Sequence, residues 1–103
     1  MEVLRDHSNG QFVIRLKEDI NISFAAELKN VLLEALACGN PIRVDIASVT
    51  EIDITGLQLF WAVERDARAL AVGIALLGGI PDDLAIALSN AGFEKFPIPA
   101  LTV

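Results

Sequence analysis

Near the start of the chain, apolar and polar residues alternate with a period of two. The segment 11–17 (QFVIRLK) places Phe12, Ile14 and Leu16 on one side, and its other side carries Gln11, Val13, Arg15 and Lys17. This pattern predicts a strand that is covered on one face. Just before it, Asn9 and Gly10 form the dipeptide that best accepts the backbone angles of a tight hairpin turn. We therefore expect residues 2–5 (EVLR) to form the first strand of a hairpin.

A helical period follows the hairpin. Between Ser23 and Ala37 the apolar residues recur at intervals of three and four, at Phe24, Leu28, Val31, Leu32 and Ala35. This spacing predicts an amphipathic helix, and Gly39 and Pro41 end it.

Two short apolar runs predict strands that lie inside a sheet. They are IRVDI (42–46) and GIALLGG (73–79), and the second is bounded by glycines. Between them a helix begins near Thr55, and its inward stripe is formed by Phe60, Val63, Ala67 and Leu70. A last helix begins around Pro81 and ends at Gly92, and the two prolines of the segment 96–103 favour an edge strand or a tail.

The order of these elements predicts an α/β fold. Helices long enough to return the chain connect the strands in parallel, so we expect a mixed, mostly parallel sheet of four or five strands, opened by the hairpin and packed against helices. In particular, the strands at 42–46 and 73–79 are expected to be parallel neighbours. No linker or repeat interrupts residues 1–103, which we interpret as a single domain.

Composition and charge exclude several classes of function. Hydrophobic residues make up 53% of the chain, but no apolar run reaches the roughly 18 residues of a membrane helix, so we expect no membrane insertion. A net charge of −6 without a Lys/Arg cluster argues against nucleic acid as a partner. The single Cys38 cannot form an internal disulfide, and no signal peptide is recognisable, which favours the cytoplasm.

Residues typical of enzymes and of metal sites are few. The chain has no GxxxxGK[ST] loop, no GxGxxG motif and no CxxC motif. His7 sits beside a predicted turn, Cys38 closes a helix at the negative end of its dipole, and Asp82 and Asp83 suit the first turn of a helix. We therefore expect no catalytic residue, no metal and no cofactor.

The sequence around Thr55 supports two interpretations. The stretch TGLQ matches a capping box, in which Thr55 bonds the N–H of Gln58 and Gln58 bonds back. A helix start also stabilises an anion, and Gly56 leaves room for an approaching kinase or a phosphoryl group. A phosphate on Thr55 would add a charge of about −1.5 to −2 close to Asp53 and repel a partner surface.

Trp61 stands outside the inward stripe of its predicted helix. At about 100° per residue it shares a polar face with Gln58, Arg65 and Arg68. Such a tryptophan is either packed beneath a loop or exposed as an anchor of a binding surface.

The run VDIASVTEIDITGLQLF, between a predicted strand and a predicted helix, resembles the signature of STAS domains, the family of bacterial anti-sigma-factor antagonists. Members carry Asp-Ser-Ser-Gly-Leu where this chain has residues 53–57, and the order of the elements agrees along nearly the whole chain. The resemblance implies that Thr55 is the phosphorylated residue and that Asp53 is the acid before it. The chain departs from the family pattern at Ile54, at the Thr acceptor, and at Asn21, where many members carry Asp.

The resemblance also implies a function. We expect a non-enzymatic switch that binds a cytoplasmic anti-sigma factor or related serine/threonine kinase and is released when Thr55 is phosphorylated. The implied partner surface comprises Asn21, Ser23, Asp53, Ile54, Gly56, Leu57, Gln58 and Trp61.

Two other functions are compatible with the sequence. One is a constitutive subunit of a larger assembly, either stressosome-like, chemotaxis-associated or a lipid-transport accessory, in which Thr55 only caps its helix. The other is a small nucleotide-binding module, which rests on family analogy. The oligomeric state is left open.

Overall fold

The computed structural model describes residues 3–6, 10–17, 20, 22–93 and 95–100. Its strands are β1 (Val3–Asp6), β2 (Phe12–Leu16), β3 (Ile42–Asp45) and β4 (Ile74–Leu76). Its helices are the 3₁₀ turn η2 (Ile22–Phe24), α1 (Ala25–Cys38), α2 (Ile54–Ala69) and α3 (Asp82–Asn90). Within this part of the chain, every helix is too short or too polar to span a bilayer.

The four strands form one mixed sheet in the order β1-β2-β3-β4. β1 and β2 pair antiparallel, with Leu4 opposite Arg15, whereas β2, β3 and β4 run parallel. Val44 lies beside Ile14 on one side and beside Leu76 on the other. The predicted α/β class, the opening hairpin and the parallel pairing of the third and fourth strands are therefore confirmed, and four strands is the lower of the two numbers expected.

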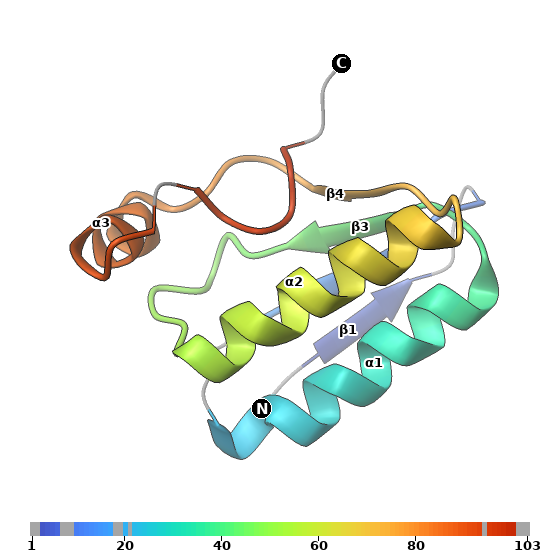
Figure 1. Cartoon of the computed structure of the whole chain (residues 1–103), viewed down its shortest axis with the longest axis horizontal. Coiled ribbons are helices and arrows are strands. Elements are labelled where there is room, and N and C mark those ends of the chain that lie inside the picture. Colours follow the sequence, from blue (N-terminus) through green and yellow to red (C-terminus); the bar gives the residue numbers. More distant parts are fainter. Residues whose placement is uncertain (1–2, 7–9, 18–19, 21, 94, 101–103) are drawn as a thin grey trace.

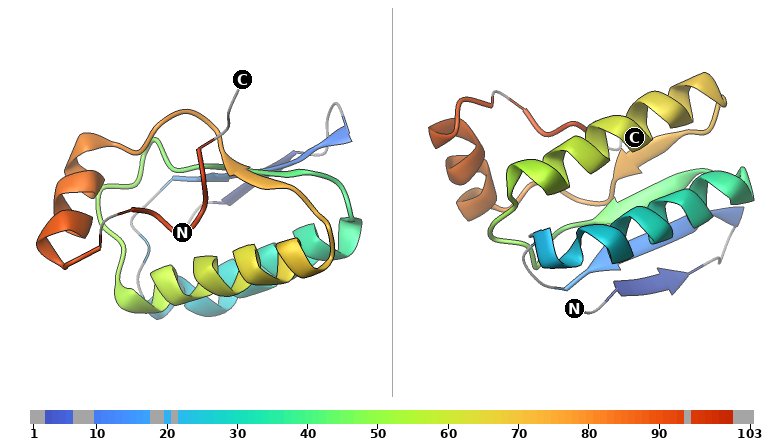
Figure 2. Two further views of the ribbon diagram at one scale, coloured as in Figure 1. Left: turned by 45° about the horizontal axis from the view of Figure 1, so that its top comes forward. Right: turned by 60° about the horizontal axis from the view of Figure 1, so that its bottom comes forward.

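Helices α1 and α2 form a second layer on one face of the sheet. Figures 1 and 2 show α1 and α2 side by side on that face and running in the same direction, with α3 beyond the end at which β3 finishes. The inward side chains of β2 and β3 meet those of α1 and α2 in one core cluster, and its fully buried members include Phe12, Ile14, Leu28, Val31, Val44 and Phe60. Burial of this apolar surface is the main stabilising term for the layered arrangement.

Two predicted orientations were wrong. The period of two predicts that Val13 lies on the uncovered side of β2, but it is only 6% exposed. It pairs in register with Arg43, which in turn pairs with Ala75, so its neighbours on the face away from the helices cover it. The helical period predicts Leu70 in the buried stripe of α2, but it is the C-terminal cap residue and is 61% exposed, because the helix ends before it.

The ends of α1 and α3 follow the sequence signals. Gly39 adopts a φ of 76° and its N–H bonds to the carbonyl of Leu36, which is the expected glycine stop. Pro81 is the N-cap residue of α3, and Asp82 and Asp83 occupy its first turn. Gly92 follows α3 with a φ of 91°.

The C-terminal segment runs along the free side of β4. The N–H of Leu76 donates to the carbonyl of Pro99 at 2.8 Å, and Leu76 and Ala100 form a single parallel bridge. Phe96 and Ile98 of this segment are buried in the core. Residues 95–100 thus behave as the predicted tail, held by one bridge and two buried side chains.

Candidate functional site

A pair of backbone hydrogen bonds joins the exit of β2 to the entry of α2. The N–H of Ile20 donates to the carbonyl of Glu51, and the N–H of Asp53 donates to the carbonyl of Ile20, both at 3.0 Å. Ile20 and Ile52 therefore form an isolated parallel bridge. Because of this bridge, the segment that precedes α2 is fixed against the segment that leads to α1.

Asp53 caps α2. Its backbone is extended, with a φ of −86° and a ψ of 173°, and its Oδ1 accepts a hydrogen bond from the N–H of Gly56 at 3.0 Å. The helix begins at Ile54, so Thr55 is the second helical residue. The predicted capping box of Thr55 and Gln58 is wrong, because the carboxylate two positions earlier already occupies the capping position, where a negative charge is favoured.

Gly56 serves packing rather than access. A Cβ at this position would lie 2.7 Å from Cγ2 of Ile20 and 2.8 Å from Cγ1 of Ile52, both closer than a real Cβ contact. Gly56 is buried, so the expectation that it leaves room for a kinase or belongs to a partner surface is wrong. Its missing side chain lets the first turn of α2 rest directly on the bridge between Ile20 and Ile52.

The other residues expected to bind a partner divide between surface and core. Ile54 is 52% exposed, Gln58 and Ser23 are exposed, and Thr55 is half-buried. Leu57 is only 2% exposed and packs in the core, so its assignment to a partner surface is wrong. Ser23 lies in η2, and Asn21 falls outside the described residues.

Thr55 and Trp61 lie on different sides of α2. At about 100° per residue, Thr55 shares its side with Leu59 and Asp66, whereas Trp61 is turned about 120° away from it. Gln58 lies between these two sides on the outward face. Trp61 is 43% exposed, and its ring packs against Phe93 with a centroid distance of 5.5 Å and an interplanar angle of 52°.

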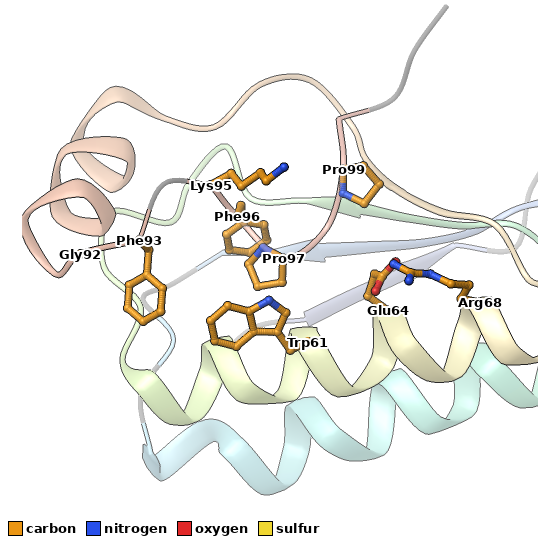
Figure 3. Close-up of a pocket in the computed structure, with 9 residues that line it drawn as sticks. All are labelled: Trp61, Glu64, Arg68, Gly92, Phe93, Lys95, Phe96, Pro97 and Pro99. Carbon is orange, nitrogen blue, oxygen red and sulfur yellow. The ribbon is translucent and has the colours of Figure 1, made fainter.

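A groove of about 680 Å³ separates the Trp61 side of α2 from the C-terminal segment (Figure 3). Its aromatic wall is formed by Trp61, Phe93 and Phe96, and its other lining residues are Glu64, Arg68, Gly92, Lys95, Pro97 and Pro99. Arg68 pairs with Glu64 one turn away, which leaves Lys95 as the other cation of the groove. Sequence reasoning identified Trp61 but not its partner Phe93, because no periodicity links positions so far apart in the chain.

Residues with metal-binding or redox chemistry are scattered over the described part of the chain. Within it, no group of three or more His, Cys, Asp or Glu side chains could hold a metal ion. Cys38 is exposed at the end of α1, and Asp82 and Asp83 are exposed in the first turn of α3. His7 falls outside the described residues.

Comparison with protein families matches nearly the whole chain. The family model described as "Mlab, STAS domain" covers residues 3–101. The chain belongs to the STAS family. A comparison with curated proteins finds no significant match to this STAS chain.

Solved structures with the same fold include anti-sigma factor antagonists. A Thermotoga maritima protein provisionally identified as such an antagonist superposes with a TM-score of 0.75 at 13% identity, over 98% of this STAS chain and 87% of its own. Unphosphorylated SpoIIAA, an anti-sigma factor antagonist, gives 0.70 at 16% identity, over 99% and 89%. The phosphorylated form of the Bacillus cell fate determinant SpoIIAA gives 0.68 at 17% identity, over 98% and 92%. These likenesses establish the fold.

Replacing Asp53 should test which residue caps α2. Asp53→Ala is expected to lower the free energy of unfolding by about 1 kcal/mol, and Asp53→Asn should retain the cap and nearly all of the stability. Thr55→Ala should be neutral or slightly stabilising, because alanine has the better helix propensity by about 0.5 kcal/mol. Urea unfolding followed by circular dichroism measures all three. A larger loss for Thr55→Ala than for Asp53→Ala would restore Thr55 as the cap.

Replacing Gly56 should test the close approach at the bridge. Gly56→Ala is expected to destabilise the fold by about 1–3 kcal/mol, because the added methyl group has to displace Ile20 or Ile52. Gly73→Ala is the matched control, since a Cβ there meets nothing within 4 Å, and it should change stability by no more than about 0.5 kcal/mol. Equal melting temperatures for the two variants would contradict this role of Gly56.

Proposed function

We propose that this STAS protein is a non-enzymatic switch that works by binding another protein. It resembles an anti-sigma factor antagonist that binds a cytoplasmic anti-sigma factor or related serine/threonine kinase, and phosphorylation of Thr55 releases it. The protein acts in the cytoplasm as one domain, without a cofactor. The observation that carries the proposal is the position of Thr55, in the first turn of α2 and free of the capping role.

The first turn of α2 is suited to receive a phosphate. Asp53 accepts from the N–H of Gly56, and the earlier N–H groups of a helix have no partner within the helix. These groups and the positive end of the helix dipole stabilise an anion at this place. A phosphate on Thr55 would therefore be tolerated by the fold, while its charge changes what the surface can bind. SpoIIAA, which shares the fold, occurs in phosphorylated and unphosphorylated forms.

The partner surface that fits this proposal is the outward face at the start of α2. Ile54 and Gln58 are exposed there, and Ser23 of η2 is exposed at the same end of the sheet. Asp53 contributes through the cap, which fixes the direction of the first turn. Trp61 lies at the border of this face and provides a large, partly exposed aromatic ring of the kind that dominates binding energies.

The second candidate function is a constitutive subunit of a larger assembly, such as a stressosome-like, chemotaxis-associated or lipid-transport complex. It is favoured by the matching family model, whose description names an Mlab STAS domain rather than an antagonist. In that case Thr55 is an ordinary first-turn residue, because Asp53 is the cap.

Affinity purification of the protein from its native cells should identify the partner. Phosphosite mapping of the purified protein should find phosphate on Thr55. Thr55→Glu in the purified protein should then weaken the complex by about a hundredfold or more, because an unpaired charge buried at an interface costs several kcal/mol. Its stability should change by at most about 1 kcal/mol, since a carboxylate is favoured near a helix start. Titration calorimetry and thermal unfolding measure the two effects.

Two control variants separate the effect of the added charge from the effect of its position in the protein. Thr55→Ala should bind like the wild type and accept no phosphate, and Ser89→Glu, which adds the same charge on the exposed surface of α3, should leave binding unchanged. Tight binding by Thr55→Glu, together with an unmodified Thr55 in cells, would favour the constitutive subunit instead.

The fluorescence of Trp61 reports on the proposed surface, because it is the one tryptophan of the chain. Acrylamide should quench it readily in the isolated protein, where the side chain is 43% exposed. Complex formation should reduce the quenching constant several-fold if the ring becomes covered. Unchanged quenching in a complex that is known to form would remove Trp61 from the partner surface.

A further inference from the structure

The groove beside Trp61 differs in chemical character between its two ends. Figure 3 shows Trp61 and Phe93 at one end and the pair of Glu64 and Arg68 toward the other. Lys95 lies on the wall opposite α2. Trp61 and Arg68 are two turns apart on α2, which corresponds to about 10 Å along the helix axis. The groove is therefore elongated, aromatic at one end and charged at the other.

The aromatic end offers apolar surface to another molecule. Trp61 remains 43% exposed, although its ring packs on Phe93. Phe96, which also lines the groove, is 4% exposed and packs on the core residue Phe60 with a centroid distance of 5.2 Å, so this wall is fixed to the core. A further aromatic ring that covers Trp61 would bury apolar area and gain the tilted or stacked geometry that aromatic pairs favour.

The charged end is locally positive on a protein whose net charge is −6. Among the residues that line the groove, the two cations Arg68 and Lys95 stand against the one acid Glu64. Arg68 pairs with Glu64, but the Arg68 side chain is 78% exposed, and Lys95 is exposed as well. Carboxylates that enter this end are attracted by both cations, and the guanidinium group of arginine matches the geometry of a carboxylate.

The shape of the groove suits an extended chain. One wall is α2, the other is the C-terminal segment, and the space between them opens to solvent. A small-molecule pocket encloses most of the surface of its ligand, which an open groove of this kind does not do. An extended peptide advances by about 3.3–3.6 Å per residue, so about three residues span the distance from Trp61 to Arg68.

We propose that this groove binds an extended segment of the partner protein, in which an aromatic residue is followed two or three positions later by acidic residues. The aromatic ring covers Trp61, and the acidic residues face Arg68 and Lys95. The inference rests on the proposed function, because the occupant belongs to the partner of the switch. Trp61 is turned about 120° from Thr55 around α2, so the groove recognises the partner while the start of α2 responds to phosphate.

Fluorescence titration of the full chain with a capped peptide of sequence AFAEEA tests the groove. Trp61 is the one tryptophan of the chain and the peptide has none, so the emission reports on the groove directly. The emission should change and saturate, with a Kd of about 1 mM or lower. Two control peptides, AFAKKA with reversed charge and AAAEEA without the ring, should each bind about tenfold more weakly or not at all.

Neutral replacements of the cations test the charged end. Arg68→Gln and Lys95→Gln should each weaken the binding of AFAEEA by about threefold or more, because each removes a positive charge from the groove. Arg65→Gln is the matched control, since Arg65 lies on the same helix, has a side chain that is 77% exposed and does not line the groove, and it should leave the affinity unchanged. Circular dichroism should show that all three variants are folded.

Competition links the groove to the partner. AFAEEA should displace the partner that affinity purification identifies, and a peptide that binds without displacing it would overturn the inference. The inference would also fail if the emission did not change at about ten times the expected Kd, if either control peptide bound equally well, or if Arg65→Gln and Arg68→Gln caused equal losses.

Failure of the switch would give a different result. Thr55→Glu should weaken the complex with the partner but leave the affinity for AFAEEA unchanged, because Thr55 lies on another side of α2. A protein that never carries phosphate, but whose partner is displaced by the peptide, would keep the groove and lose the switch. A phosphorylated protein that ignores the peptide would keep the switch and lose the groove.

Discussion

The bridge between Ile20 and Ile52 determines the geometry of the candidate site. Two backbone hydrogen bonds hold the entry of α2 against the exit of β2, and Gly56 lets the first helical turn come into contact with both isoleucines. The backbone of Asp53 is extended at this point, so its carboxylate faces the N–H groups of the turn. The place of Thr55 therefore depends on an interaction between segments that lie far apart in the sequence.

The sequence predicted the layers of the fold well because hydrophobic periodicity records burial. The alternation along β2 and the three-and-four spacing along α1 agree with the observed core, and parallel crossovers follow from the order of the elements. The errors fall where burial depends on neighbours rather than on period. Val13 is covered by the adjacent strand, and Leu70 follows the last turn of its helix.

The candidate site was only partly predictable. The motif placed Thr55 at a helix start, but Asp53 and Thr55 both belong to the residue types that cap helices. The path of the loop decides between them, and the contact that sets this path has no local signal. The packing of Trp61 on Phe93 is a similar case, since a tertiary contact covers part of a ring that the helical period could only place on a polar face.

The tail beside β4 has a consequence for how the sheet meets other molecules. An outer strand with unpaired N–H and C=O groups is a template on which another chain can add a strand. Here Leu76 already donates to Pro99, and neither Pro97 nor Pro99 has an N–H to offer to a further strand. The border beside β4 is therefore a poor template for a strand of another molecule, and the opposite edge of the sheet is formed by β1.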